Sequence, residues 1–234
     1  MINFSVEEAL AKPLNENDKS RQGWKQNPEA VKRDIIRVAM TEFAQNGLSG
    51  ARVDRIAASM KTSKRMIYYY FGDKEGLYAQ VLEYAYAKVR EGEKKLSLDD
   101  LPPLEAIAKL VGFTFDHHRN NPDFLRMVMI ENIHHADYLR RSEIIPKMNS
   151  AAVERLEKLI ARGEADGVFR SGLDPLRLHW QISAFSVFNV ANADTFGANF
   201  GSALFTAKGQ AALRREVIET ILAYVRKPRE EETP

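Results

Sequence analysis

Proline and glycine residues divide this chain into stretches of helical length, and this punctuation restricts its fold more than any other feature. Between the breaks, apolar residues recur at helical spacing, as Ile35, Ala39 and Phe43 do, which places them on one face of a helix. Strand patterns, in which apolar and polar residues alternate between hairpin turns, are missing from the sequence. The pattern therefore predicts an all-α protein with about nine helices.

The same breaks set the expected helix boundaries. Asn27 and Pro28 suit the cap and first position of the first helix, and Gly47 suits the left-handed residue that ends it. Asp73 is the expected cap of a long helix, and the Gly-rich segment 197–202 is expected to form a loop. The predicted helices span residues 28–46, 53–60, 64–70, 74–94, about 101–120, 122–135, 142–165, 175–194 and 207–225.

Composition excludes several kinds of protein. The 234 residues include no cysteine, so neither a disulfide framework nor a thiolate metal site is available. No apolar run approaches the roughly 18 residues that a membrane-spanning helix needs. The amino-terminal residues also lack the apolar core of a signal peptide. We therefore expect a cytoplasmic protein that does not associate with a membrane.

Charge is distributed unevenly along the chain. The net charge is only +2, but residues 28–75 contain nine lysine and arginine residues against six acids, whereas residues 76–234 are slightly acidic. A basic patch on one short segment favours a polyanionic partner such as nucleic acid. A solvated surface of mixed charge would produce the same count, so charge alone leaves both interpretations open.

Two short predicted helices, at 53–60 and 64–70, follow a longer amphipathic helix and are joined by a tight turn, which is the layout of a helix-turn-helix. Ser63 can cap the second helix and donate to a phosphate. Lys64 and Arg65 in its first turn oppose the helix dipole, a small cost that makes sense if the partner is DNA. An ordinary surface helix with a tyrosine-rich packing face would explain the same residues.

The string VDRIAASMKTSKRMIYYYFGDKEGLYAQVL, residues 53–82, resembles the DNA-binding signature of the TetR/AcrR family of regulators. That signature has an Ile-Ala pair on one helix, a Ser-Lys start to the next, an aromatic run ending in Phe, and a turn into Lys-Glu-x-Leu. The corresponding residues here are Ile56-Ala57, Ser63-Lys64, Tyr68–Phe71 and Lys74–Leu77.

The chain departs from the family pattern at two places. Lys61 stands in the turn where the family often has glycine, and a lysine with positive φ would be mildly strained. Ala51-Arg52 stands where the family tends to place a hydroxyl before the second helix, so one cap is missing and Arg52 is available to grip phosphate instead.

The resemblance implies a transcriptional regulator rather than an enzyme, most simply a repressor that needs no cofactor. It would act as a homodimer, bind double-stranded operator DNA, and release it on binding a small-molecule effector. Residues 1–27 would form an arm that either reaches a minor groove through Lys19, Arg21 and Lys25 or is mobile. Residues 28–75 would form the DNA-binding domain, 76–228 the ligand-binding and dimerisation domain, and 229–234 a tail.

Carried over by matching position, the resemblance implies two kinds of DNA contact. The residues expected to face the bases are Lys64, Arg65, Met66 and Tyr68, and those expected to hold phosphates are Arg52, Ser63, Tyr69, Tyr70 and Lys74.

The remaining helices carry candidate effector and dimer residues, although all of these could be plain core or surface residues. The expected ligand contacts are polar or adaptable side chains on apolar helices: Phe113, His117, Phe124, Met127, Glu131, His134, Phe185, Phe188 and Asn189. The expected dimer core is Trp180, Ala184, Val187 and Ala191 from one helix and Leu213, Val217, Ile221 and Tyr224 from another. Segment 120–142 also resembles C-terminal domains of a subgroup that includes pyrimidine-utilisation regulators.

Three rival interpretations remain. Glu131 and His134 lie three residues apart, as in helical carboxylate metal enzymes, but a second copy of that motif is missing. The same pair would suit a metal-responsive regulator. A DNA-binding protein without an effector would be more basic than residues 76–234 are.

Overall fold

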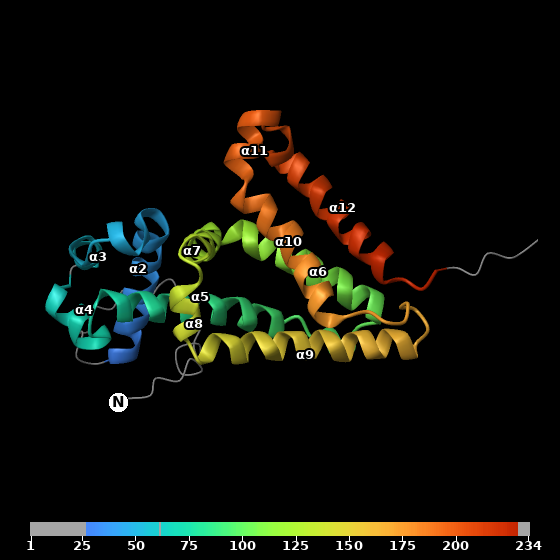
Figure 1. Ribbon diagram of the computed structural model, residues 1–234, viewed down its shortest axis with the longest axis horizontal. Coiled ribbons are helices and arrows are strands. Elements are labelled where there is room, and N and C mark those ends of the chain that lie inside the picture. Colours follow the sequence, from blue (N-terminus) through green and yellow to red (C-terminus); the bar gives the residue numbers. More distant parts are fainter. Residues whose placement is uncertain (1–26, 61, 229–234) are drawn as a thin grey trace, which may run out of the picture. The chain divides into compact units, whose positions relative to one another are not determined.

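The computed structural model describes residues 27–60 and 62–228, and within these ranges the chain forms eleven α-helices, two 3-10 turns and no strand (Figure 1). The helices are α2 (Pro28–Gly50), α3 (Val53–Ser59), α4 (Lys64–Phe71), α5 (Lys74–Lys94), α6 (Pro103–Asn120), α7 (Pro122–Ile133), α8 (Asp137–Arg141), α9 (Ile144–Ala165), α10 (Pro175–Ala191), α11 (Ala193–Phe200) and α12 (Ala207–Val225). The 3-10 turns are η1 (Leu98–Asp100) and η2 (Ala203–Phe205). The expected all-α fold is confirmed.

The chain packs as two compact units. The amino-terminal unit comprises residues up to Glu91 together with Arg126–Pro146, and the carboxy-terminal unit comprises Gly92–Leu125 and the residues from Lys147 onward. These units are defined by packing rather than by function, so the expected functional boundary at residue 75 stays a prediction. The arm before residue 27 and the tail after residue 228 lie outside the described residues.

The core of the amino-terminal unit is built from the apolar stripe of α2. Ile35, Ala39 and Phe43 are fully buried, and the Phe43 ring meets the buried Tyr78 ring of α5 edge to face, with 5.1 Å between centroids. Burying one large apolar side chain contributes about 1.5–3 kcal/mol. Packing of this stripe therefore holds α2 in place. Helix α3 packs against α2, and α4 packs against α3.

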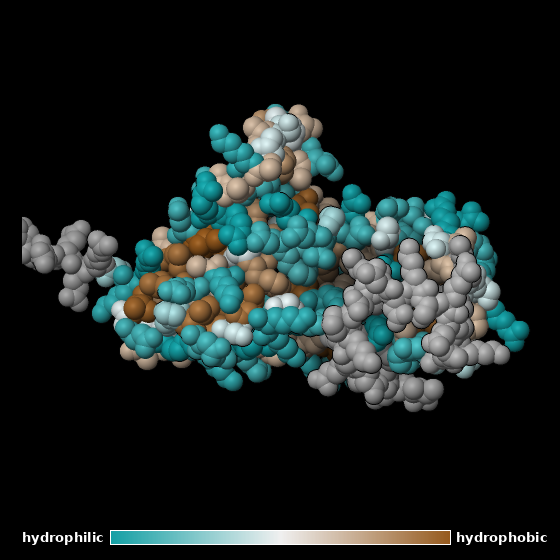
Figure 2. Space-filling model, turned by 180° about the vertical axis from the view of Figure 1, so that it is seen from behind, coloured by the Kyte–Doolittle hydropathy of each residue, from teal (hydrophilic) through white to brown (hydrophobic). Residues whose placement is uncertain are grey.

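The carboxy-terminal unit is a helical bundle in which α6 lies against both α10 and α12 (Figure 1). Its buried core draws on α6, α9, α10 and α12 and includes Ile107, Val111, Phe115, Leu156, Ile160, Leu178, Ile182, Val217, Ile221 and Val225. Gly163 of α9 accommodates the buried Phe169 ring, because a Cβ at this position would overlap that ring. Several large apolar side chains of this unit are nevertheless exposed, namely Leu176, Trp180, Phe185, Phe188 and Phe200. Figure 2 shows apolar surface on the face that is turned away in Figure 1.

Most expected boundaries agree with the structure. Helix α12 begins and ends as predicted, and Asn27 caps α2 through its side chain. Gly47 adopts the expected positive φ of 64°, but it kinks α2 instead of ending it, because the helix continues to Gly50. Asp73 accepts a hydrogen bond from the Gly76 amide at 2.6 Å at the start of α5. None of the described helices is both long and apolar enough to cross a membrane.

Two helices were missed, so the expected count of nine was too low. The segment expected to be a Gly-rich loop is partly helical, because α11 continues to Phe200. Its Phe196 ring lies 4.7 Å from Phe200 and 6.1 Å from Phe205, and this packing outweighs the low helix propensity of Gly197. The other missed helix, α8, begins after His135 and Ala136, whose φ values of 58° and 59° end α7 two residues early.

Candidate nucleic-acid interface

Helices α3 and α4 form the two arms of a helix-turn-helix. The turn between them is held by backbone hydrogen bonds from Met60 and Thr62 to the Ala57 carbonyl, at 3.3 and 3.0 Å. Lys61, where the sequence departs from the family pattern, lies outside the described residues, so its expected strain stays a prediction. Ile67 is fully buried and anchors α4 to the unit, which leaves the opposite face of α4 in solvent.

The amino-terminal turn of α4 carries exposed cations. The Ser63 hydroxyl accepts a hydrogen bond from the Met66 amide at 3.3 Å, as expected for the cap, and its side chain remains exposed. Lys64 and Arg65 follow in the first turn, both exposed, and that turn contains no acid. A helix amino terminus carries a partial positive charge, and two added cations strengthen its attraction for phosphate.

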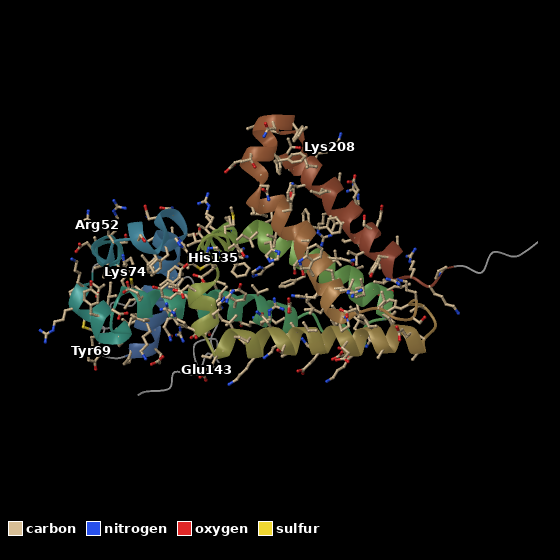
Figure 3. All side chains as sticks on the ribbon, viewed as in Figure 1. Arg52, Tyr69, Lys74, His135, Glu143 and Lys208 are labelled. Carbon is tan, nitrogen blue, oxygen red and sulfur yellow. The ribbon has the colours of Figure 1, made fainter. Side chains whose placement is uncertain are left out.

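The tyrosines of α4 differ in their surroundings. Tyr69 is 78% exposed and Tyr68 42%, so both hydroxyls are available to a partner (Figure 3 labels Tyr69). Tyr70 is half-buried, with the Lys32 ammonium of α2 over its ring at 5.8 Å. Met66 is also half-buried. The exposed side chains suit DNA contact better than Met66 and Tyr70, and the expected DNA contacts of all of them stay predictions.

Two further basic residues border the helix-turn-helix (Figure 3). Lys74, at the start of α5, donates from its ammonium to the Ala51 carbonyl at 3.4 Å, which ties α5 to the junction of α2 and α3. Arg52 precedes α3 with an exposed side chain, and α3 has no side-chain cap, as the missing hydroxyl predicted.

Two acids that sequence reasoning passed over organise these cations. Glu42 of α2 accepts a hydrogen bond from the Arg52 amide at 3.0 Å and lies 3.5 Å from the Arg55 guanidinium, so it fixes the residue that precedes α3. Asp54 of α3 lies 2.6 Å from the Lys64 ammonium and 3.8 Å from the Arg52 guanidinium. The sequence signal that could have revealed this pairing was an acid, Asp54, close in sequence to residues expected to contact DNA.

The expected ligand residues come from both compact units. Met127, Glu131 and His134 belong to the amino-terminal unit, and the other six belong to the carboxy-terminal unit. There, His117 lies 5.5 Å from the Phe113 ring and 6.2 Å from the Phe124 ring. These three side chains are brought together.

The polar members of the set already have protein partners or are exposed. Glu131, 1% exposed, accepts hydrogen bonds from the Tyr78 hydroxyl at 2.9 Å and the Leu139 amide at 3.0 Å, so its carboxylate links α5, α7 and α8. Burial is the main cause that raises the pKa of Tyr78, and the hydrogen bond to Glu131 raises this pKa further. His134 is exposed, and the described residues contain no group of three metal-ligating side chains. Glu131 thus has a structural role in this unit, and the suggested ligand or metal contact stays a prediction.

Asn189 also has a partner within the chain. Its amide and that of Gln210 on α12 exchange two hydrogen bonds of 2.9 Å, and both residues are buried. The pair borders a surface hollow of about 330 Å³ that Arg119 and Phe205 also line. Phe185 and Phe188, at 43% and 56% exposed, lie on the surface of α10, and their expected ligand contacts stay predictions.

The expected dimer core needs correction on α12. Val217 and Ile221 are 4% and 1% exposed and belong to the core of their own unit, so they have no surface to offer a second subunit. Trp180 on α10, by contrast, is 69% exposed. The other expected interface residues, Ala184, Val187, Ala191, Leu213 and Tyr224, are half-buried, and they stay predictions.

A helix-turn-helix whose second helix presents cations and tyrosines to solvent defines a DNA-binding protein. Comparison with known proteins specifies the family. Residues 35–81 match the family described as "Bacterial regulatory proteins, tetR family", and residues 103–221 match "Tetracyclin repressor-like, C-terminal domain". The chain belongs to the TetR family of transcriptional regulators, which confirms the resemblance seen in residues 53–82.

Individual relatives agree with this assignment. The chain is 32% identical over 173 residues to the HTH-type transcriptional repressor NicS of Pseudomonas putida, covering 74% of this chain and 82% of NicS. It is 29% identical over 155 residues to the regulator RutR of Escherichia coli K12, covering 66% and 71% of the two chains. A crystal structure of the putative transcriptional regulator SCO4942 from Streptomyces coelicolor superimposes with a TM-score of 0.66 at 25% identity, covering 84% of this chain and 99% of that one.

Proposed function

We propose that this protein is a homodimeric repressor that binds a palindromic operator through the major groove and releases it when a small molecule binds. The observation that carries the proposal is the exposed face of α4, where Lys64, Arg65, Tyr68 and Tyr69 stand free of the core. Such a face fits a groove about 12 Å wide, whose base edges distinguish all four base pairs.

Repression is supported by relatives. NicS is named as a transcriptional repressor, as is SCO4008 of Streptomyces coelicolor, which is 37% identical to this chain over 109 residues. FadR of Bacillus subtilis, which shares the fold with a TM-score of 0.64, was crystallised with stearoyl-CoA. We propose that the carboxy-terminal residues of this chain likewise take a small molecule of a class still to be found.

The specificity that a regulator needs supports the dimer and the palindrome together. One reading helix contacts few bases, so useful specificity needs two half-sites presented to two copies of α4. The effector would act by binding one arrangement of the two copies better than the other. A differential of about 1–3 kcal/mol is usual for such coupling.

The proposal is tested by selecting duplexes from a random-sequence pool with the purified protein, then measuring binding of the selected operator and a scrambled duplex. Arg65→Ala is expected to reduce the preference for operator. Lys74→Ala is expected to weaken both duplexes alike and to flatten the dependence of log K on log salt by about one unit.

Arg140→Ala is the matched control, because Arg140 is an exposed arginine on α8, outside the helix-turn-helix. It should bind both duplexes like the unaltered protein. Recovery of no enriched sequence would contradict operator binding itself. Equal effects of Arg65→Ala and Arg140→Ala would show that α4 is not the helix that reads the bases.

A further inference from the structure

One carboxylate lies among the cations that α3 and α4 offer to DNA. Asp54 Oδ1 is 2.6 Å from Lys64 Nζ, and Asp54 Oδ2 is 3.8 Å from Arg52 Nη2. Arg52 directly precedes α3 and Lys64 is the first residue of α4, so Asp54 bridges the cations at the starts of both helices. The three side chains are 50%, 63% and 48% exposed.

The stability that these ion pairs contribute to the fold is too small to explain why Asp54 lies between two cations. Ion pairs this exposed contribute little to stability, because water and salt screen them. An acid in the first turn of α3 is favourable for the helix dipole, but that benefit does not require Lys64. The consequence of the contact lies instead on the DNA-facing side, where a carboxylate holds two cations that a phosphate would also attract.

We infer that Asp54 is a specificity-determining residue, which competes with DNA phosphates for Lys64 and Arg52 and so suppresses binding to non-operator DNA. The inference rests on the proposed function. Binding to non-operator DNA is almost wholly electrostatic, so releasing the cations from Asp54 and leaving its carboxylate near a polyanion is costly there. On operator, a Lys64 that Asp54 holds in place donates to base edges from a fixed position, and this benefit of Asp54 offsets its repulsion of the phosphates.

The test compares Asp54→Asn with Asp34→Asn. Asp34 on α2 is 46% exposed and pairs with Arg37 at 3.6 Å, so its substitution changes the net charge equally but away from Lys64. Fluorescence anisotropy would measure the Kd of each variant for the selected operator and for its scrambled version, over a series of salt concentrations. Thermal unfolding of both variants checks that the fold is retained.

Asp54→Asn is expected to bind scrambled duplex about three- to tenfold tighter, from the loss of two exposed pairs, with a salt slope steeper by about 0.9. Operator affinity should change by less than about twofold, so the specificity ratio falls, whereas Asp34→Asn should leave that ratio unchanged. Adding Lys64→Ala should reduce the effect of Asp54→Asn, since the acid acts largely through this lysine.

Equal gains on operator and scrambled duplex, or equal behaviour of the two asparagine variants, would overturn the inference. Loss of operator binding by Asp54→Asn would also overturn it, because Asp54 would then be contacting a base itself. In each of these cases the unaltered protein still selects an operator, so the proposed function stands. If the unaltered protein binds no duplex, the proposed function fails and this inference fails with it.

Discussion

Replacing Tyr78 with phenylalanine removes one hydroxyl from a buried polar link in the amino-terminal unit. Tyr78 is 1% exposed, and its hydroxyl donates to Glu131, which also accepts from the Leu139 amide. The ring is held between Phe43 at 5.1 Å and Tyr138 at 5.0 Å, so phenylalanine keeps the packing. The substitution therefore isolates the hydrogen bond.

The expected cost follows from the burial of the acceptor. A hydrogen bond to a charged group contributes about 1.5–3 kcal/mol, and an acceptor left buried without its donor keeps the desolvation penalty. We expect Tyr78→Phe to lower the free energy of unfolding by about 2 kcal/mol. In a chain of this size, that corresponds to a fall in Tm of about 4–8 °C.

Substitutions of the acceptor, Glu131, should cost more or less stability than Tyr78→Phe, depending on which hydrogen bonds they keep. Glu131→Ala leaves the Tyr78 hydroxyl and the Leu139 amide without an acceptor, which adds about 1–3 kcal/mol for each. Glu131→Gln keeps an oxygen for Leu139 and presents its NH2 group to the Tyr78 oxygen, so it should cost least.

The pH dependence supplies a second readout with a definite sign. Burial and the hydrogen bond to Glu131 raise the pKa of Tyr78 in the folded protein, whereas in the unfolded chain it is near 10. The resulting stability is fully present below the unfolded value and is lost as pH rises beyond it. Tyr78→Phe should remove this component, so its stability should fall less steeply than that of the unaltered protein above about pH 10.

Denaturant unfolding followed by circular dichroism measures both quantities. Tyr84→Phe is the matched control, because Tyr84 lies on the same helix, is half-buried, and has the Lys88 ammonium over its ring at 5.6 Å. A Tyr78→Phe protein as stable as Tyr84→Phe, with an unchanged alkaline limb, would refute the assignment of this hydrogen bond.

Three further outcomes are expected. Burial raises the pKa of Glu83, so the stability that its protonated form contributes is present below about pH 4.3 and is lost as pH rises. Glu83→Gln should therefore raise Tm at neutral pH but not in acid. An equal gain from Glu143→Gln, at an exposed site, would contradict this. Trp180→Glu should convert the dimer to monomer by light scattering and abolish operator binding, whereas Ile133→Glu, at a site 70% exposed, should do neither. Gly163→Ala should cost about 1–3 kcal/mol in chemical unfolding by forcing its methyl group into Phe169, and an unchanged midpoint would show that the ring can move.

The outline of the fold was predictable because its signals are local. Caps such as Asn27 and Ser63 satisfy amides within three residues, and Gly47 interrupts α2 through its own positive φ. The exposure of Lys64, Arg65, Tyr68 and Tyr69 was predictable for the same reason, since a short helix anchored by one fully buried residue, Ile67, leaves its opposite face in solvent.

Helix α11 could not be predicted in this way, because it depends on aromatic contacts with residues farther along the chain. Phe196 packs against Phe205, and no local pattern around Gly197 signals that contact. Burial on α12 was likewise a tertiary result. Val217 and Ile221 share a helical stripe that suits either an internal core or a dimer interface, and only the packing of α12 against α6 assigns it to the core.

The amino-acid sequence by itself determined the helices that end at their own caps and the identity of the cations on the reading helix. Tertiary structure alone decided which charges meet. Asp54 and Lys64 lie ten residues apart, and Tyr78 and Glu131 lie 53 apart, so their pairing depends on how separate helices pack. Side-chain partners across helices are set by the summed burial of many apolar groups, which no short stretch of sequence contains.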